Sequence, residues 1–262
     1  MSGIKIRGTG RFAPAKIVTN DDLAKIVDTS DEWIVSRTGI KERRFAREGE
    51  NLTQFAVEAA RQAIARAGIR PEDLGLCLMG TVTSDNATPA QSCLVHQALR
   101  LPEDCPAFDL SAGCSGFLYA METAAALLPR MSRPYALILG GELLSRITNM
   151  EDRSTCILFG DGVGAVVVKS TQDAPWYALL GARGATGYPV VGRHGQRGAL
   201  SPHERPGGLQ VRPGDRPSGG PDPAGQGRHG EGAGGLVRAP SGQPPHCGVG
   251  GPASEGASEQ VL

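Results

Sequence analysis

The sequence predicts an α/β fold in the front of the chain and a coil-like tail behind it. Short apolar runs suited to buried strands alternate with segments whose apolar residues recur at helical spacing, and glycines separate them. Such alternation is typical of a sheet with helices packed on its faces. A change in composition marks the tail: from residue 185 onward Gly and Pro make up 31 of 78 residues, against 25 of 184 before it.

The elements of the front follow in order along the chain. Residues 4–10 predict a strand that runs into glycines, and residues 51–69 predict a helix that begins after an Asn51 cap and stops at Gly68. The remaining elements alternate: strands over 74–82, 105–110 and 134–142, helices over 88–101 and 114–128, and over 156–169 two strands that meet around glycines. We expect this half-fold to end near residue 170.

Composition narrows the classes of function. The 27 basic and 27 acidic residues cancel, so neither nucleic acid nor an anionic membrane is expected as a partner. The first residues lack the apolar core of a signal peptide, and no apolar run reaches membrane-spanning length. No C-x-x-C pair occurs, which argues against a disulfide framework or a metal site and favours the reducing cytoplasm; the six cysteines are Cys77, Cys93, Cys105, Cys114, Cys156 and Cys247.

Cys114 lies in the stretch DLSAGCSGFLYA, at the turn between the strand ending at Leu110 and the following helix. The unpaired N–H groups and the dipole of a helix N-terminus stabilise a thiolate, and the small neighbours of Cys114 leave an oxyanion within reach of backbone N–H groups. This arrangement suits covalent acyl transfer through a thioester. The alternative is a small buried apolar residue, because free cysteine is among the most buried residue types. Spacing alone leaves both open.

Three motifs carry a resemblance to a known family. The stretch FDLSAGCSGFLYA (108–120) resembles the active-site segment of thiolase-fold condensing enzymes. TSDEWIVSRTGIKERR (29–44) and DRSTCILFGDGVGA (152–165) narrow the resemblance to β-ketoacyl-acyl carrier protein synthase III, the enzyme that starts type II fatty-acid synthesis. The resemblance runs from residue 3 to about 184. It implies the N-terminal half of a thiolase-like fold over 1–170 and the start of the second half over 171–184. The tail over 185–262 does not match the family, and its Gly- and Pro-rich composition predicts disorder.

The resemblance also implies an activity. Cys114 would take an acyl group, most often acetyl, from an acyl-coenzyme A. Malonyl-acyl carrier protein would lose carbon dioxide, and its carbanion would attack the acyl-cysteine to give 3-oxoacyl-acyl carrier protein. The acyl-coenzyme A is a substrate here, no resident cofactor or metal is implied, and the full-length protein would be a homodimer.

The resemblance assigns roles to further residues. Thr29, Trp33 and Arg37 match residues that line the coenzyme A channel, where Trp33 would stack on the adenine. Arg37 and Arg153 would meet the nucleotide end with their fixed charges. Phe159 would lie beside the acyl pocket, above a glycine turn that packs beneath the nucleophile. Without the motif, Trp33 is an ordinary packing aromatic and Arg37 a solvated helix residue.

The second half of the family's motifs does not occur in this sequence. The family's catalytic His stands in a PHQAN motif and its Asn in a GN-containing loop; the tail lacks both and has no Asn. None of its four histidines can take the family role: His194, His203, His229 and His246. His96, on a predicted helix, is expected to be an ordinary surface or packing residue.

A shift of reading frame explains the tail. When residues 235–254 are back-translated and read one base later, synonymous codons permit a sequence that contains PHQAN, and residues 200–213 become family-like in the same frame. We hypothesise a one-base insertion shortly after residue 184. Three functions stay open: a synthase III, an incomplete fragment that at most self-acylates or pairs with intact subunits, and another thiolase-fold enzyme of the hydroxymethylglutaryl-coenzyme A synthase or chalcone-type group. The Trp33 and Arg37 motif favours the first over the third.

Overall fold

The computed structural model describes residues 3–173 and 175–182. All of these residues belong to one compact unit. The predicted tail over 185–262 and its reading frame therefore lie outside the described residues. None of the helices in the described part is long and apolar enough to cross a membrane.

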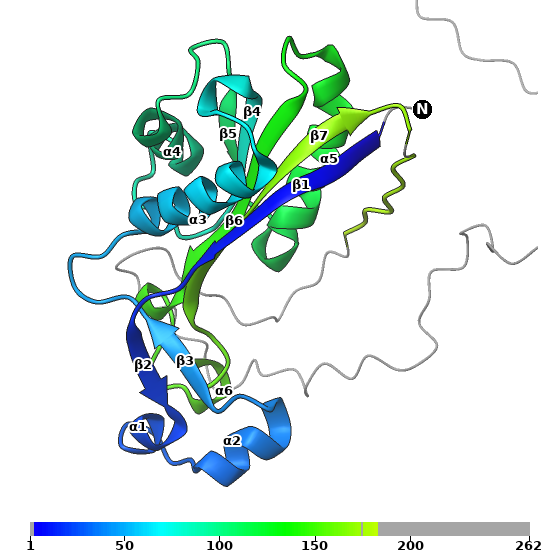
Figure 1. Ribbon diagram of the computed structural model, residues 1–262. Coiled ribbons are helices and arrows are strands. Elements are labelled where there is room, and N and C mark those ends of the chain that lie inside the picture. The colour runs from blue at the N-terminus through cyan, green and yellow to red at the C-terminus, as the bar shows by residue number, and fades with distance from the viewer. Residues whose placement is uncertain (1–2, 174, 183–262) are drawn as a thin grey trace, which may run out of the picture. The chain divides into compact units, whose positions relative to one another are not determined.

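From β3 onward, strands and α-helices alternate along the described part of the chain (Figure 1). The strands are β1 Gly3–Phe12, β2 Lys16–Thr19, β3 Glu42–Phe45, β4 Leu74–Gly80, β5 Ala107–Leu110, β6 Tyr135–Leu143 and β7 Asp161–Thr171. The α-helices are α1 Asn20–Ala24, α2 Asp31–Thr38, α3 Leu52–Ala67, α4 Gln91–Leu99, α5 Gly116–Leu127 and α6 Arg153–Cys156.

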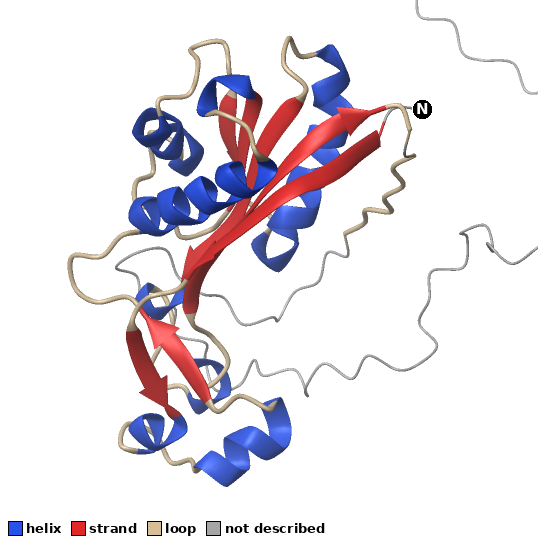
Figure 2. Ribbon diagram, in the orientation of Figure 1, coloured by secondary structure: helices blue, strands red, loops and turns tan. Residues whose placement is uncertain are grey.

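Five of the strands form one sheet in the order β1-β7-β6-β4-β5. Strand β4 is parallel to β5 and β6, whereas β7 is antiparallel to β6 and β1. Helices α3 and α4 cover one face and α5 covers the other (Figure 2). Because side chains alternate along a strand, Cys77 and Met79 of β4 pack toward α3 and α4, while Leu76 and Leu78 pack toward α5. The predicted α/β class is confirmed.

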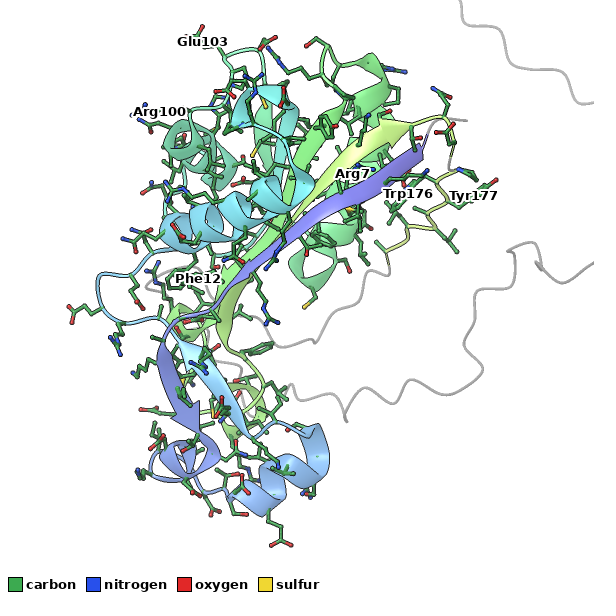
Figure 3. All side chains as sticks on the ribbon, in the orientation of Figure 1. Arg7, Phe12, Arg100, Glu103, Trp176 and Tyr177 are labelled. Atoms are coloured by element: carbon green, nitrogen blue, oxygen red, sulfur yellow. The ribbon has the colours of Figure 1, made fainter. Side chains whose placement is uncertain are left out.

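Helix α3 has the ends that the sequence predicts. The Asn51 side chain accepts a hydrogen bond from the Gln54 N–H, and the Gln54 side chain returns one to the Asn51 N–H, which forms a capping box. Gly68 ends the helix at φ +67°, a left-handed conformation that favours glycine. On the sheet side, Phe55 of α3 packs against the ring of Phe12 in β1, with ring centroids 4.9 Å apart (Figure 3 labels Phe12).

The prediction of two strands over 156–169 is wrong. Cys156 ends the short helix α6, which Asp152 caps by accepting the Ser154 N–H, and a single strand, β7, begins at Asp161. The glycines do not break this strand, because β6 and β1 pair with it on both sides and hold it extended; Gly164, for example, faces Gly140 of β6.

The segment before α3 and the later helix α6 form a small subdomain that the sequence does not predict. Strands β2 and β3 pair antiparallel, and α1, α2 and α6 gather around a separate apolar cluster that includes Leu23 and Ile34 (Figure 1, lower part). Helix α2 begins where the Ser30 hydroxyl accepts the Trp33 N–H and ends at Gly39 with φ +72°. The subdomain positions Trp33.

A segment after β7 returns along α5. Trp176 packs on the apolar cluster beneath α5, and its indole N–H donates to Glu122 Oε2 at 2.6 Å (Figure 3). The Tyr119 hydroxyl donates to the Gly181 carbonyl at 3.1 Å. Leu118 of α5 nevertheless remains 59% exposed, so part of the outer face of this helix is apolar and open to solvent.

Candidate active site

Cys114 lies in the 3-10 turn Gly113–Ser115, which joins the end of β5 to the start of α5. Gly113 adopts φ +53°, a left-handed conformation that lets the chain reverse there, and the Ser115 N–H donates to the Ala112 carbonyl at 3.2 Å. The Cys114 side chain is exposed. The turn thus presents a solvent-accessible thiol directly before a twelve-residue helix.

Gly80, Gly116 and Gly140 let α5 approach the sheet closely. A Cβ on Gly80, the last residue of β4, would lie 2.5 Å from the Gly116 carbonyl carbon and 2.7 Å from the Phe117 nitrogen. A Cβ on Gly140 of β6 would lie 3.1 Å from the Phe117 Cβ. Because real Cβ atoms do not fit at the first of these distances, the position of the Cys114 turn depends on glycine at Gly80.

The other cysteines of the described part are less accessible than Cys114. Cys77, Cys105 and Cys156 are buried and Cys93 is half-buried, and none of the five forms a disulfide. Burial raises the pKa of Cys77 well above its usual value, the pKa of Cys105 to about 11, and also the pKa of Cys156. These three groups remain thiols at neutral pH and are poor nucleophiles.

Trp33, Arg37 and Arg153 come together although they are far apart in sequence. The Arg37 guanidinium carbon lies 4.3 Å from the Trp33 ring centroid, and that of Arg153 lies 4.7 Å from it. Arg153 also donates to the Asp28 carbonyl at 2.9 Å. Trp33 is half-buried against the subdomain cluster, whereas both arginines are exposed. The cluster therefore offers a flat aromatic surface with two cationic groups, which suits an anionic, planar ligand.

Thr29 and Arg43 are two further polar residues of the subdomain that carries Trp33. The Thr29 hydroxyl is buried without a hydrogen-bond partner among the described residues. Arg43 is buried and donates to the carbonyls of Val18 at 3.3 Å and Ile157 at 3.0 Å, which ties the segment after α6 to β2. Burial lowers the pKa of Arg43. Arg43 thereby helps to fix the helix that carries Arg153.

The glycines over 160–164 contact two different elements: Gly160 lies against β3, and Gly164 pairs with β6. A Cβ on Gly160 would lie 3.2 Å from the Arg43 Cβ, so Gly160 packs against β3 rather than against α5. Gly164 pairs with Gly140, the residue of β6 that contacts α5. Phe159, just before the run, is half-buried. His96 is half-buried on α4, and its Nε2 lies 2.9 Å from the Pro102 carbonyl, as expected of a packing histidine.

Three carboxylates near the turn were not singled out from the sequence. Asp109 of β5 accepts the N–H groups at the start of α4, from Gln91 at 2.6 Å and Ser92 at 2.8 Å. Asp85 does the same for α3, and Glu142 binds the segment after β4. One feature of the sequence points to Asp109. Helix α4 begins after Ala90, whose side chain cannot accept the first N–H groups of the helix, so another residue has to accept them.

The chain matches known proteins over its front part. The family model for 3-oxoacyl-[acyl-carrier-protein] synthase III matches residues 108–184. The β-ketoacyl-[acyl-carrier-protein] synthase III of Rhizorhabdus wittichii is 49% identical over 189 residues, which cover 72% of this chain and 57% of the relative. The corresponding protein of Clostridium beijerinckii is 49% identical over 175 residues and is covered to 53%. The chain therefore spans a little over half the length of these relatives.

Solved structures agree with the sequence matches. The crystal structure of 3-oxoacyl-[acyl-carrier-protein] synthase III from Aquifex aeolicus superposes with a TM-score of 0.62 at 48% identity, covering 65% of this chain and 55% of that chain. The crystal structure of a priming β-ketosynthase from the R1128 polyketide pathway superposes with a TM-score of 0.62 at 34% identity, covering 66% of this chain and 51% of that chain. A likeness at 22% identity, to OleA of Xanthomonas campestris, concerns the fold alone.

The fold and the cysteine turn define a thiolase-like condensing-enzyme fold, of which this chain contains the N-terminal half. Within that class, the front part of the chain belongs to the β-ketoacyl-acyl carrier protein synthase III family, as a partial segment of it.

Proposed function

We propose that Cys114 is an acyl-accepting nucleophile and that the chain derives from an enzyme that condenses an acyl-coenzyme A with malonyl-acyl carrier protein. The observation that carries the proposal is the exposed thiol at the junction of β5 and α5. A thioester can reach this thiol, whereas the other four described cysteines are buried or half-buried. Family membership supplies the reaction class.

The first step is transfer of the acyl group. The Cys114 sulfur attacks the carbonyl carbon of the acyl-coenzyme A, the bond from that carbon to the coenzyme A sulfur breaks, and coenzyme A leaves as a thiolate that takes up a proton. Backbone N–H groups at the first turn of α5 stabilise both the attacking thiolate and the oxyanion of the tetrahedral intermediate. Acetyl is the proposed starter group, and the two thioesters supply the chemistry without a resident cofactor.

The second step forms the carbon–carbon bond. Malonyl-acyl carrier protein loses carbon dioxide, and the resulting carbanion attacks the acyl carbon on Cys114. The bond from that carbon to sulfur breaks, which releases 3-oxoacyl-acyl carrier protein and restores the thiolate. The enolate formed on the way needs hydrogen-bond donors, and the family's His and Asn motifs for that role do not occur in this sequence.

A second candidate function follows from that difference. The chain spans 57% of the Rhizorhabdus wittichii relative and contains no PHQAN motif. An incomplete fragment of this kind would accept an acyl group on Cys114, or pair with intact subunits, without completing condensation.

The residues around Trp33 are proposed to hold the coenzyme A end of the substrate. The indole of Trp33 stacks on the adenine, and Arg37 and Arg153 bind the phosphates. Since both guanidinium groups now lie over the indole, adenine binding requires at least one of them to turn toward the phosphates. By the family resemblance, Thr29 is assigned to the coenzyme A channel and Phe159 to the acyl pocket.

A homodimer in the cytoplasm is proposed for the full-length protein. Strand β5 is an edge of the described sheet, and its Phe108 is 37% exposed. An edge strand carries unpaired backbone groups that can pair with a second copy.

An assay of both steps tests the function. The chain is incubated with acetyl-coenzyme A and malonyl-acyl carrier protein, and 3-oxoacyl-carrier protein is measured beside a full-length relative as positive control. Product formation supports the complete enzyme. Acetylation of the protein without product supports the incomplete fragment. Absence of both contradicts the proposed function.

A further inference from the structure

We propose that Glu142 is a positioning residue for Cys114: its carboxylate holds the end of β4 on which the Cys114 turn rests. The proposal deepens the function above and rests on Cys114 as the nucleophile. Glu142 lies near the end of β6, beside β4 in the sheet.

The Glu142 carboxylate collects donors from three successive residues after β4. Oε1 accepts the Val82 N–H at 2.9 Å, and Oε2 accepts the Thr81 hydroxyl at 3.0 Å and also the hydroxyl of Thr83. Thr81 and Thr83 are 3% and 2% exposed, so loss of their hydrogen bonds to Glu142 leaves two buried hydroxyl groups without that partner.

The directions of these bonds require a carboxylate. The Thr83 hydroxyl accepts the Leu143 N–H at 2.9 Å, and the Thr81 hydroxyl accepts the Thr83 N–H at 3.2 Å. Each hydroxyl has one proton, and in both cases that proton points at Glu142. A carboxamide at this position would present its NH₂ group either to the two hydroxyl protons or to the Val82 N–H. Replacement by Gln therefore removes at least one bond without changing side-chain size.

The segment held by Glu142 contacts the cysteine turn at both ends. Gly80, directly before the held residues, lies against the backbone of Gly116, two residues after Cys114. The Thr81 N–H donates to the Leu110 carbonyl at 3.2 Å, four residues before Cys114. Without the hydrogen bonds to Glu142, Gly80 and Thr81 are less firmly held, and both of their contacts with the cysteine turn can shift. The N–H groups of α5 then no longer align with the Cys114 sulfur.

Alkylation of Cys114 tests this role in the full 262-residue chain. Iodoacetamide is displaced by the Cys114 sulfur with loss of iodide, and the rate is read at each cysteine by peptide mass spectrometry over a range of pH. We expect Glu142→Gln and Thr83→Val each to slow the reaction at Cys114 by about fivefold or more, the scale that small misplacements of reacting groups produce.

Two controls separate positioning from general loss of stability. Thr83→Ser keeps the hydroxyl and should restore the wild-type rate. Asp161→Asn removes another buried carboxylate, one that binds Ala46 and Ser145, and should lower stability while leaving Cys114 unchanged. If Glu142→Gln does not fold, the comparison of Thr83→Val with Thr83→Ser tests the positioning role without it.

The outcomes are distinguishable from those of the proposed function. Wild-type rates in Glu142→Gln and Thr83→Val, or an equal change in Asp161→Asn, would overturn the positioning role even if Cys114 is acetylated. A slower alkylation of Cys114 in Glu142→Gln and Thr83→Val supports the positioning role, whatever acetyl-coenzyme A does. Wild-type protein that acetyl-coenzyme A leaves unmodified would overturn the separate proposal that Cys114 accepts the acyl group.

Discussion

The Cα of Gly80 lies 3.1 Å from the position that a Cβ would take on Gly116, so the end of β4 and the start of α5 meet backbone to backbone. The two residues are separated by 36 positions in sequence, and between them runs the segment that carries Cys114. The position of the Cys114 turn thus depends on packing between distant glycines.

The first prediction concerns this contact. Gly80→Ala places a methyl group 2.5 Å from the backbone of Gly116, so α5 has to shift. We expect the free energy of unfolding to fall by about 1–3 kcal/mol, the usual cost of overpacking. Gly164→Ala is the matched control, because its methyl group would meet only the Gly140 carbonyl oxygen, at an ordinary van der Waals distance of 3.9 Å. Urea unfolding of both variants measures the difference; equal stability of the two would contradict the contact.

The second prediction concerns the Trp33 cluster. The chain has two tryptophans, Trp33 beside Arg37 and Arg153, and Trp176 against α5. Coenzyme A should change the tryptophan emission of the wild type and of Trp176→Phe, but not that of Trp33→Phe. A fluorescence titration with coenzyme A measures this. A change that disappears in Trp176→Phe and persists in Trp33→Phe would place the ligand elsewhere.

Binding strength at the same cluster gives a third prediction. Arg153→Leu keeps an aliphatic side chain on the indole but removes one cation, and we expect coenzyme A affinity to fall about three- to tenfold, as for loss of one charge-assisted contact. Arg61→Leu, on α3 in an exposed pair with Glu58, is the control for overall charge and should bind normally. Calorimetric titration distinguishes the two. A loss of affinity in Arg61→Leu equal to that in Arg153→Leu would indicate unspecific charge attraction.

The fourth prediction follows from the pKa of Asp85. Burial acts to raise this pKa, but hydrogen bonds from Leu52 and Thr53 outweigh it, so the pKa lies below its usual value. The ionised carboxylate therefore stabilises the fold above the unfolded-state pKa of about 3.9, and this contribution is lost as pH falls through the folded-state pKa. Asp85→Asn should lower the free energy of unfolding by about 1–2 kcal/mol at pH 7.

The difference between wild type and Asp85→Asn should begin to shrink below about pH 4, where Asp85 of the unfolded chain becomes protonated, and should shrink further as pH falls toward the lower folded-state pKa. Chemical unfolding at several pH values measures it. A difference that is constant from pH 7 to pH 3, in a protein that remains folded over that range, would contradict the role of the ionised carboxylate.

Much of the main sheet could be predicted from local signals. Helix α3 is an example, because Asn51 and Gly68 mark both ends and its apolar residues recur at helical spacing. The subdomain before it could not be predicted in the same way. Helices α1 and α2 span only five and eight residues, and their stability comes from a shared apolar cluster rather than from their own periodicity.

In the candidate site too, features set by local sequence could be predicted and features set by distant contacts could not. The sequence neighbours of Cys114 predict its place at a strand-to-helix turn. The close packing of the following helix on the sheet depends on Gly80 and Gly140, which the sequence does not connect with Cys114. Glu142 went unnoticed because its partners lie 59–61 residues away. Strand β7 was misjudged because glycines usually break strands, and only pairing on both sides keeps this one extended.

The fifth prediction concerns the coding DNA. Residues 185–262 keep no family motif in the written frame, whereas the frame one base later permits PHQAN within 235–254. We expect the DNA of residues 180–205 to contain an extra base and the shifted frame to remain open. Resequencing this region measures both. A DNA sequence with stop codons in the shifted frame would contradict the hypothesis.

Peptide-level mass spectrometry after exposure to acetyl-coenzyme A tests the acyl-accepting role of Cys114 most directly. We expect an added acetyl group on the peptide that carries Cys114, removed by hydroxylamine as a thioester is, and absent from Cys114→Ala. Peptides with Cys77, Cys93, Cys105 and Cys156 should remain unmodified. An unmodified Cys114 in folded wild-type protein, or equal acetylation of Cys114→Ala, would contradict the role of Cys114 as the acyl acceptor.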